Sequence, residues 1–130
     1  MRLYSSVGSF DVIKLLVQDA IINQGLVIDY TGRPRMMLER TRTDVGGRKL
    51  YKNAEFSLFC SATFSRKTME ADVANISFFP YVIFYCELES EPEKIYVGYR
   101  RPAIAGSKAS MKSLRAVDDL LHKIIKEATE

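Results

Sequence analysis

The sequence predicts an α+β fold in which two terminal helices pack on one face of an antiparallel sheet. Helical apolar periods lie near the two ends of the chain, at about residues 10–24 and 107–128. Between them lie several short runs of β-branched and aromatic residues, a composition typical of strands. The chain has 130 residues, the usual size of one domain, and neither a linker nor an internal repeat interrupts it. We therefore expect a single domain over residues 1–130 with one core.

A first strand is expected around residues 3–7, followed by a helix over residues 10–24. Ser9 is the candidate N-cap, Asp11 lies in the first turn, where a carboxylate suits the helix dipole, and Gly25 is the candidate residue after the helix. The apolar period of this helix is indicated by Val12, Leu15, Leu16, Asp19 and Ile22.

The next strand is predicted over residues 26–30 and ends at the turn-forming residues 31–34. Residues 35–49 are interpreted as a mobile excursion that leaves the sheet. Within it, residues 36–38 suit one helical turn, and the glycines at residues 46–47 permit positive φ.

A third strand is expected from Asn53, with its core at residues 56–60. Ser61 or Ser65 is the candidate N-cap of a short helix that ends at Asp72. The sequence leaves the choice between the two serines open.

A hairpin is predicted in the second half of the chain. Pro80 marks a strand start or a bulge, because proline disrupts the centre of a sheet. Strands over residues 81–86 and 95–99 are then joined by residues 89–93, a loop length that suits a hairpin.

The last helix begins after Ser107, a candidate N-cap, and carries one apolar stripe. The stripe, which we expect to be buried, consists of Leu114, Val117, Leu121, Ile124 and Ala128. The polar face, which we expect to be exposed, includes Lys112, Arg115, Asp118, Lys126 and Glu127.

The net charge of +3 is too small to indicate nucleic-acid binding, but the charges are unevenly distributed. Residues 33–53 carry seven basic side chains and two acidic ones. An acidic turn at residues 87–93 is the counterpart of this basic segment. Both segments suit solvated loops. The alternatives are an anion-binding rim, or a two-fold dimer contact between the basic segment and the partner's acidic turn. The rim would consist of Arg33, Arg35, Arg40, Arg42 and Arg48, and the acidic turn of Glu87, Glu89, Glu91 and Glu93.

Several segments resemble the domain of unknown function 302 family, in particular its branch found in sulfur-oxidising bacteria. The resemblance covers about residues 8–128 and rests on the motifs at residues 51–55, 59–62, 75–76 with 80–83, and 97–101. It implies a β-α-β4-α fold similar to the TATA-box-binding-protein class, often dimeric, and it implies no reaction. That branch carries a cysteine before the proline; because Phe79 stands there, no role of that cysteine transfers.

Cys60 and Cys86 lie on predicted strands among apolar neighbours, where a free cysteine acts as a small hydrophobe. This inert interpretation is favoured, because the two lack the Cys-x-x-Cys redox spacing. The alternative is that helix amides and cationic neighbours stabilise the Cys60 thiolate, which would suit a sulfur carrier or a redox sensor.

His122, the single histidine, lies one helical turn after Asp118, and a surface link between the two is the favoured interpretation. The alternative is an axial ligand to haem, bound with the help of a methionine thioether. The candidate methionines are Met36, Met37, Met69 and Met111.

No motif indicates an enzyme, a protein-only metal site, nucleic-acid binding or a membrane span, so we expect a non-enzymatic protein that, as written, is cytoplasmic. The leading hypothesis is a small dimeric binding or accessory domain that holds an apolar or haem-like ligand between sheet and helices. The resemblance would place it in bacterial sulfur metabolism. The competing hypothesis is thiol chemistry at Cys60.

Overall fold

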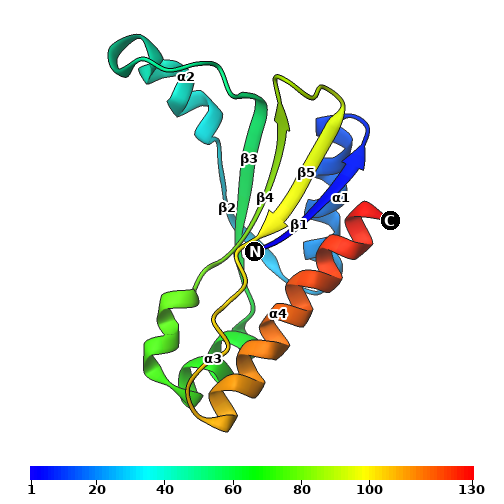
Figure 1. The fold of residues 1–130 in the computed structure, drawn as a ribbon. Helices are drawn as coiled ribbons and strands as arrows, with labels where there is room; N and C mark the ends of the chain where they lie inside the picture. The colour runs from blue at the N-terminus through cyan, green and yellow to red at the C-terminus, as the bar shows by residue number, and fades with distance from the viewer.

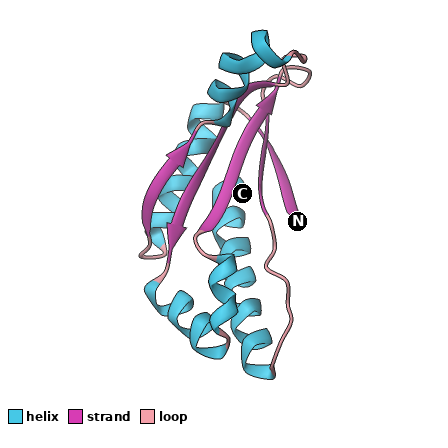
Figure 2. Ribbon diagram, turned by 90° about the vertical axis from the view of Figure 1, so that its left-hand side faces the viewer, coloured by secondary structure: helices cyan, strands magenta, loops and turns pink.

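The computed structural model describes residues 1–130 and contains one five-stranded antiparallel sheet, with the strand order β1-β5-β4-β3-β2. Helices α1 and α4 pack side by side on one face of the sheet, and the other face is uncovered (Figures 1 and 2). The α+β class and all five predicted strands are thereby confirmed. In chain order, the elements are β1 (Arg2–Val7), α1 (Phe10–Asn23), β2 (Val27–Gly32), α2 (Pro34–Val45), β3 (Tyr51–Cys60), α3 (Ala62–Ala71), the 3-10 helix η1 (Val73–Phe78), β4 (Tyr81–Leu88), β5 (Lys94–Tyr99) and α4 (Lys108–Thr129).

The core lies between the sheet and the pair α1 and α4. Successive strand residues point to opposite faces, so in β4 Tyr81, Ile83 and Tyr85 are buried while Val82 is exposed. All five residues of the predicted stripe on α4 are buried, and Leu120 and Ile125 join them. The stripe prediction is therefore confirmed.

For α1, the prediction of which face is buried is wrong. The residues of the predicted face are exposed, and the opposite face is buried. Both faces of α1 are apolar, so periodicity alone does not distinguish them. The buried face contains Phe10, whose ring centroid lies 5.8 Å from that of Tyr85, whereas the other face would have buried the charge of Asp19. The buried residues are Phe10, Ile13, Val17, Ala20 and Ile21.

Residues 35–49, expected to be a mobile excursion with one helical turn at residues 36–38, are largely the helix α2. Pro34 occupies its first turn, where a proline costs no hydrogen bond, and Gly46, with a φ of 77°, follows its last residue. No residue of α2 is buried, and the helix stands at one end of the sheet against β3 (Figure 1). The proline and glycine at its ends favour a helix. The segment has no buried apolar stripe, the pattern from which a helix is usually predicted.

Ser61, not Ser65, caps α3: its hydroxyl accepts a hydrogen bond from the backbone N–H of Phe64 at 3.2 Å. The short helix η1 was not predicted; Asp72 caps it by accepting from the N–H of Ala74. Together α3 and η1 lie below the sheet against α4 (Figure 1). None of the helices combines the length and the apolar character needed to cross a membrane.

Candidate functional site

A cleft of about 510 Å³ opens at the end of the sheet where β4 begins and β5 ends. It is bounded by η1, by α4 and by the segment that leaves β5, and its walls are mostly apolar or aromatic. The residues that line it are Met1, Ser77, Phe78, Pro80, Tyr81, Val82, Phe84, Arg100, Arg101, Pro102, Val117 and Leu121.

Gly98 gives one wall of the cleft its shape. It pairs with Phe84 across β4 and β5, and a Cβ built on Gly98 would lie 2.9 Å from the Phe84 ring. The same Cβ would lie 2.7 Å from the carbonyl oxygen of Arg2 on the edge strand β1. Glycine therefore lets the ring of Phe84 lie close to the uncovered sheet face.

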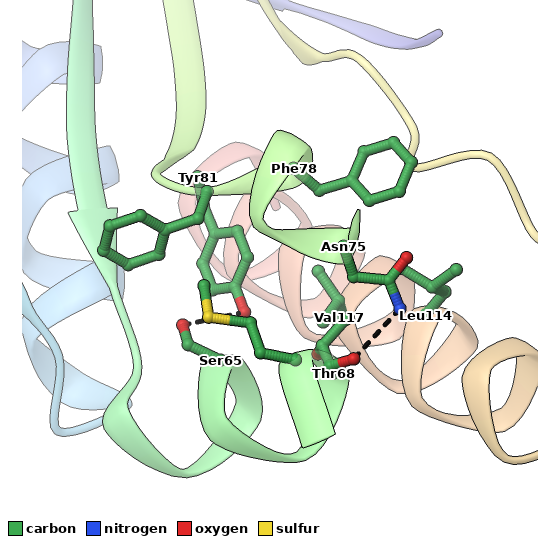
Figure 3. Close-up of a pocket in the computed structure, with 9 residues that line it drawn as sticks. Ser65, Thr68, Asn75, Phe78, Tyr81, Leu114 and Val117 are labelled. Carbon is green, nitrogen blue, oxygen red and sulfur yellow. Dashed lines mark hydrogen bonds between the residues drawn. The ribbon is translucent and has the colours of Figure 1, made fainter. Parts of the chain in front are cut away.

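A second wall is held by a polar network behind the cleft (Figure 3). The Asn75 side-chain amide donates to the carbonyl of Thr68 and to the hydroxyl of Ser110, both at 2.9 Å. The cavity beside this network measures only about 10 Å³, room for one water molecule at most. Phe78, Tyr81 and Val117 line both this cavity and the cleft, so the network supports the cleft wall from behind.

Asp118, expected on the exposed face of α4, is only 3% exposed and lies at the centre of a charged network. Its carboxylate accepts from the Tyr99 hydroxyl at 2.6 Å, from Arg101 Nη2 at 2.8 Å and from Arg2 Nη2 at 3.3 Å. Burial alone would raise the pKa of Asp118, but these hydrogen bonds outweigh it and hold the pKa below its ordinary value. Burial and the adjacent carboxylate raise the pKa of Tyr99.

The predicted link between Asp118 and His122 is wrong, because the arginines and Tyr99 take all of the Asp118 contacts. His122 instead shares a hydrogen bond between its Nδ1 and the hydroxyl of Tyr4 on β1. The sequence alone could not show these contacts. The partners of Asp118 and His122 lie on β1, on β5 and in the segment after β5.

The two arginines of the cleft differ in their partners. Arg101 is bound to Asp118 through Nε and Nη2. Arg100 is exposed and forms no ion pair. No acidic side chain lines the cleft. Its mouth is therefore positively charged. Arg100 was not among the residues that the sequence singled out; its only signal was the adjacent pair of arginines after a strand.

The candidate haem ligands are not brought together. Met36 and Met37 are exposed on α2, Met69 lies on α3, and Met111 and His122 are separated along α4 by about 16 Å. None of these five residues lines the cleft. Only Met69 lines the small cavity behind it, which has room for a single water molecule.

Cys60 is half-buried at the end of β3, and its thiol lies 3.5 Å from a carboxylate oxygen of Asp29. Burial, then the hydrogen bond to Asp29 and then its negative charge raise the pKa of Cys60. The alternative interpretation, that helix amides and cationic neighbours stabilise the Cys60 thiolate, gains no support from this contact, because Asp29 is an anion. Cys86 is also half-buried and free, and burial raises its pKa.

The basic residues predicted to form a rim divide into two groups. Arg33 pairs with Glu55 at 3.7 Å, and Arg40 is exposed on α2. Arg35, Arg42 and Arg48 line a hollow of about 180 Å³ between α2 and the segment that follows it. Arg42 is partly neutralised there by Glu39, at 3.7 Å.

In the acidic turn, expected to be a solvated loop, Glu89 and Glu93 are exposed but Glu87 is buried. Glu87 is 4% exposed, and its carboxylate accepts from the N–H of Glu93 at 2.7 Å and from the Asn53 amide at 3.0 Å. Burial opposes ionisation of Glu87, but these donors and Lys52 lower its pKa. Glu89 pairs with Lys49 at 3.3 Å, so the basic and acidic segments meet within one chain.

Comparison with known proteins shows what the fold resembles. No family model matches the chain, and no curated protein does. A crystal structure described as "uncharacterized conserved protein DUF302 from Bacillus stearothermophilus" is similar to it, with a TM-score of 0.82 over 98% of this chain and 96% of that one, at 8% sequence identity. The predicted DUF302-like fold is thereby confirmed, and the sulfur-oxidising branch stays a prediction.

Proposed function

We propose that this protein of DUF302-like fold is a non-enzymatic binding domain that holds a mainly apolar small molecule in the cleft below the sheet. The observation that carries the proposal is the cleft itself. Its volume of about 510 Å³ lies within the range of small-molecule sites, and most of its walls are apolar with a few polar groups. The place where the sequence led us to expect a ligand, between the sheet and the two terminal helices, is filled by the core, and the cleft lies instead at the end of the sheet.

The ionisable groups of the cleft suit binding better than catalysis. Two of its three ionisable side chains belong to arginines, which serve poorly as bases because a guanidinium is not deprotonated in proteins. The third is Tyr81, whose hydroxyl bonds to Ser65 at 3.3 Å and whose pKa is raised by burial. We propose an organic molecule rather than haem, because neither His122 nor any candidate methionine lines the cleft.

The thiol alternative has less support. A sulfur carrier needs a nucleophilic thiolate near neutral pH, whereas burial and Asp29 favour the protonated thiol of Cys60.

A homodimer is part of the proposal. Apolar side chains exposed on the uncovered sheet face, such as Leu3 and Val27, support it because a second copy would bury them.

A cleft-filling substitution tests the ligand site. The chain has no tryptophan, so Ser77→Trp both fills the cleft and adds a unique fluorophore. We expect the neutral dye Nile red to bind the native protein with one site and a blue-shifted emission, and to bind Ser77→Trp at least tenfold more weakly.

Ser90→Trp, at an exposed position in the turn between β4 and β5, is the matched control and should bind the dye like the native protein. Absence of dye binding by the native protein, or an equal loss in both variants, would contradict the proposed site.

A further inference from the structure

We propose that the ligand of the cleft is an amphipathic carboxylate, whose acidic head binds Arg100 at the mouth and whose apolar body lies between the walls formed by Phe78 and Phe84. This inference rests on the proposed function and adds the chemical class of the ligand.

The first step is the balance of charge around the cleft. The three guanidinium groups near it belong to Arg2, Arg100 and Arg101, and the one carboxylate belongs to Asp118. Among these side chains, three positive charges against one negative charge leave an excess of two. Because no acidic side chain lines the cleft, a ligand with an anionic group would offset this excess.

The second step identifies which arginine is free to bind. Arg101 uses Nε and Nη2 on Asp118, at 3.2 and 2.8 Å, so one of the two edges of its guanidinium group that can form a paired contact is occupied, and its charge is paired with that carboxylate. Arg100 has no such partner and lies at the cleft. Its planar group can donate two parallel hydrogen bonds to one carboxylate, a contact that needs no second cation.

The third step concerns the rest of the ligand. Beyond Arg100 the walls present the rings of Phe78 and Phe84 and the aliphatic side chains of Val82 and Leu121. These groups offer apolar contact and no hydrogen-bond donor, so the ligand's body should be a hydrocarbon chain or ring. Next to such low-polarity walls a bound charge pair is less screened than in bulk water.

Decanoate and decanol provide the test, because the two probes share an apolar body and differ in the head group. Affinity is measured by displacement of Nile red from the native protein at neutral pH and low salt. We expect decanoate to bind at least about tenfold more tightly than decanol, and Arg100→Gln to remove that difference.

Arg100→Lys should retain part of the preference for decanoate, because the positive charge remains and the paired geometry is lost. Arg40→Gln, which removes another exposed positive charge, on the distant α2, should change neither affinity.

Equal binding of decanoate and decanol, or an unchanged preference in Arg100→Gln, would overturn the carboxylate assignment while leaving the proposed function intact. Decyl phosphate that binds more tightly than decanoate, and loses affinity in Arg100→Gln, would overturn the choice of carboxylate over phosphate. If neither decanoate, decanol nor Nile red binds the native protein, the proposed function fails together with the inference.

Discussion

Asp118 shows how the network below the sheet tolerates a buried charge. Moving a carboxylate out of water is costly unless hydrogen bonds and opposite charges replace its hydration. Tyr99, Arg101 and Arg2 supply these contacts from β5, the segment after it and β1. The carboxylate thus ties α4 to two neighbouring strands and orients Arg101 at the cleft.

Asp118→Asn should lower the free energy of unfolding by about 2–3 kcal/mol, because two arginines lose their charged acceptor. This value lies below the full cost of breaking a buried ion pair, since both arginines remain partly exposed. Urea denaturation measures the loss. Asp119→Asn, at the exposed neighbouring position, is the control, and equal losses in the two variants would contradict the network's role.

The stabilisation from Asp118 should depend on pH. Because its pKa is lower in the folded protein than in the unfolded chain, the stabilisation is complete above the unfolded value of about 3.9 and is lost as the pH falls through the folded pKa. The difference in unfolding free energy between the native protein and Asp118→Asn should therefore shrink as the pH is lowered from 6 toward 3. A constant difference over that range would show that the charge of Asp118 contributes nothing.

Cys60 should react slowly with a thiol reagent at neutral pH, because its raised pKa leaves little thiolate. The rate is measured in Cys86→Ser, so that one thiol is observed, and is compared with that of a small free thiol. Asp29→Asn should accelerate the reaction by removing a nearby negative charge. Rapid labelling of the native protein would instead favour the sulfur-carrier hypothesis.

Among the helices, α1 and α4 differ in how clearly their sequences identify the buried face. The polar side chains of α4 leave it a single apolar stripe, apart from the buried Asp118. In α1, apolar residues occur on both faces, and packing of Phe10 against Tyr85 accompanies burial of the unexpected one. A helix with two apolar faces can be recognised from sequence, but its orientation depends on what it packs against.

Leu121→Ala should cost about 2–5 kcal/mol, because Leu121 is 3% exposed in the core stripe of α4. Leu15→Ala on α1 should change stability by no more than about 0.5 kcal/mol, because Leu15 is 58% exposed. Chemical denaturation of both variants compares the two helix faces. If Leu121→Ala lowers the free energy of unfolding by less than about 0.5 kcal/mol, the assignment of Leu121 to the buried face of α4 is contradicted.

Across the molecule as a whole, the charged segments act mainly within one chain. Glu87 and Glu89 contact Lys52 and Lys49, and Glu91 accepts from the Tyr96 hydroxyl at 2.6 Å. The Lys49–Glu89 pair joins the turn between β4 and β5 to the segment after α2, and the other two contacts lie within the sheet and its hairpin. The idea that the acidic turn steers a partner's basic segment therefore loses much of its basis.

A homodimer should nevertheless be present at micromolar concentration and should persist at high salt, because apolar contacts rather than exposed ion pairs would hold it. Sedimentation at low and high ionic strength measures this. Neutralising Glu89 and Glu91 should leave the dimer affinity unchanged. A monomer under both conditions would contradict the dimer.

Local patterns in the sequence were enough to predict the α+β class, the five strands and the buried stripe of α4, because these depend on periodicity and turn residues. The orientation of α1, the burial of Asp118 and Glu87, and the cleft beside Arg100 emerged only from the folded arrangement. Each of these depends on side chains that are distant in the chain and adjacent in space: Asp118 meets Arg2 across 116 positions. Local patterns carry no information about such pairs, since their energy arises only when the sheet brings them together.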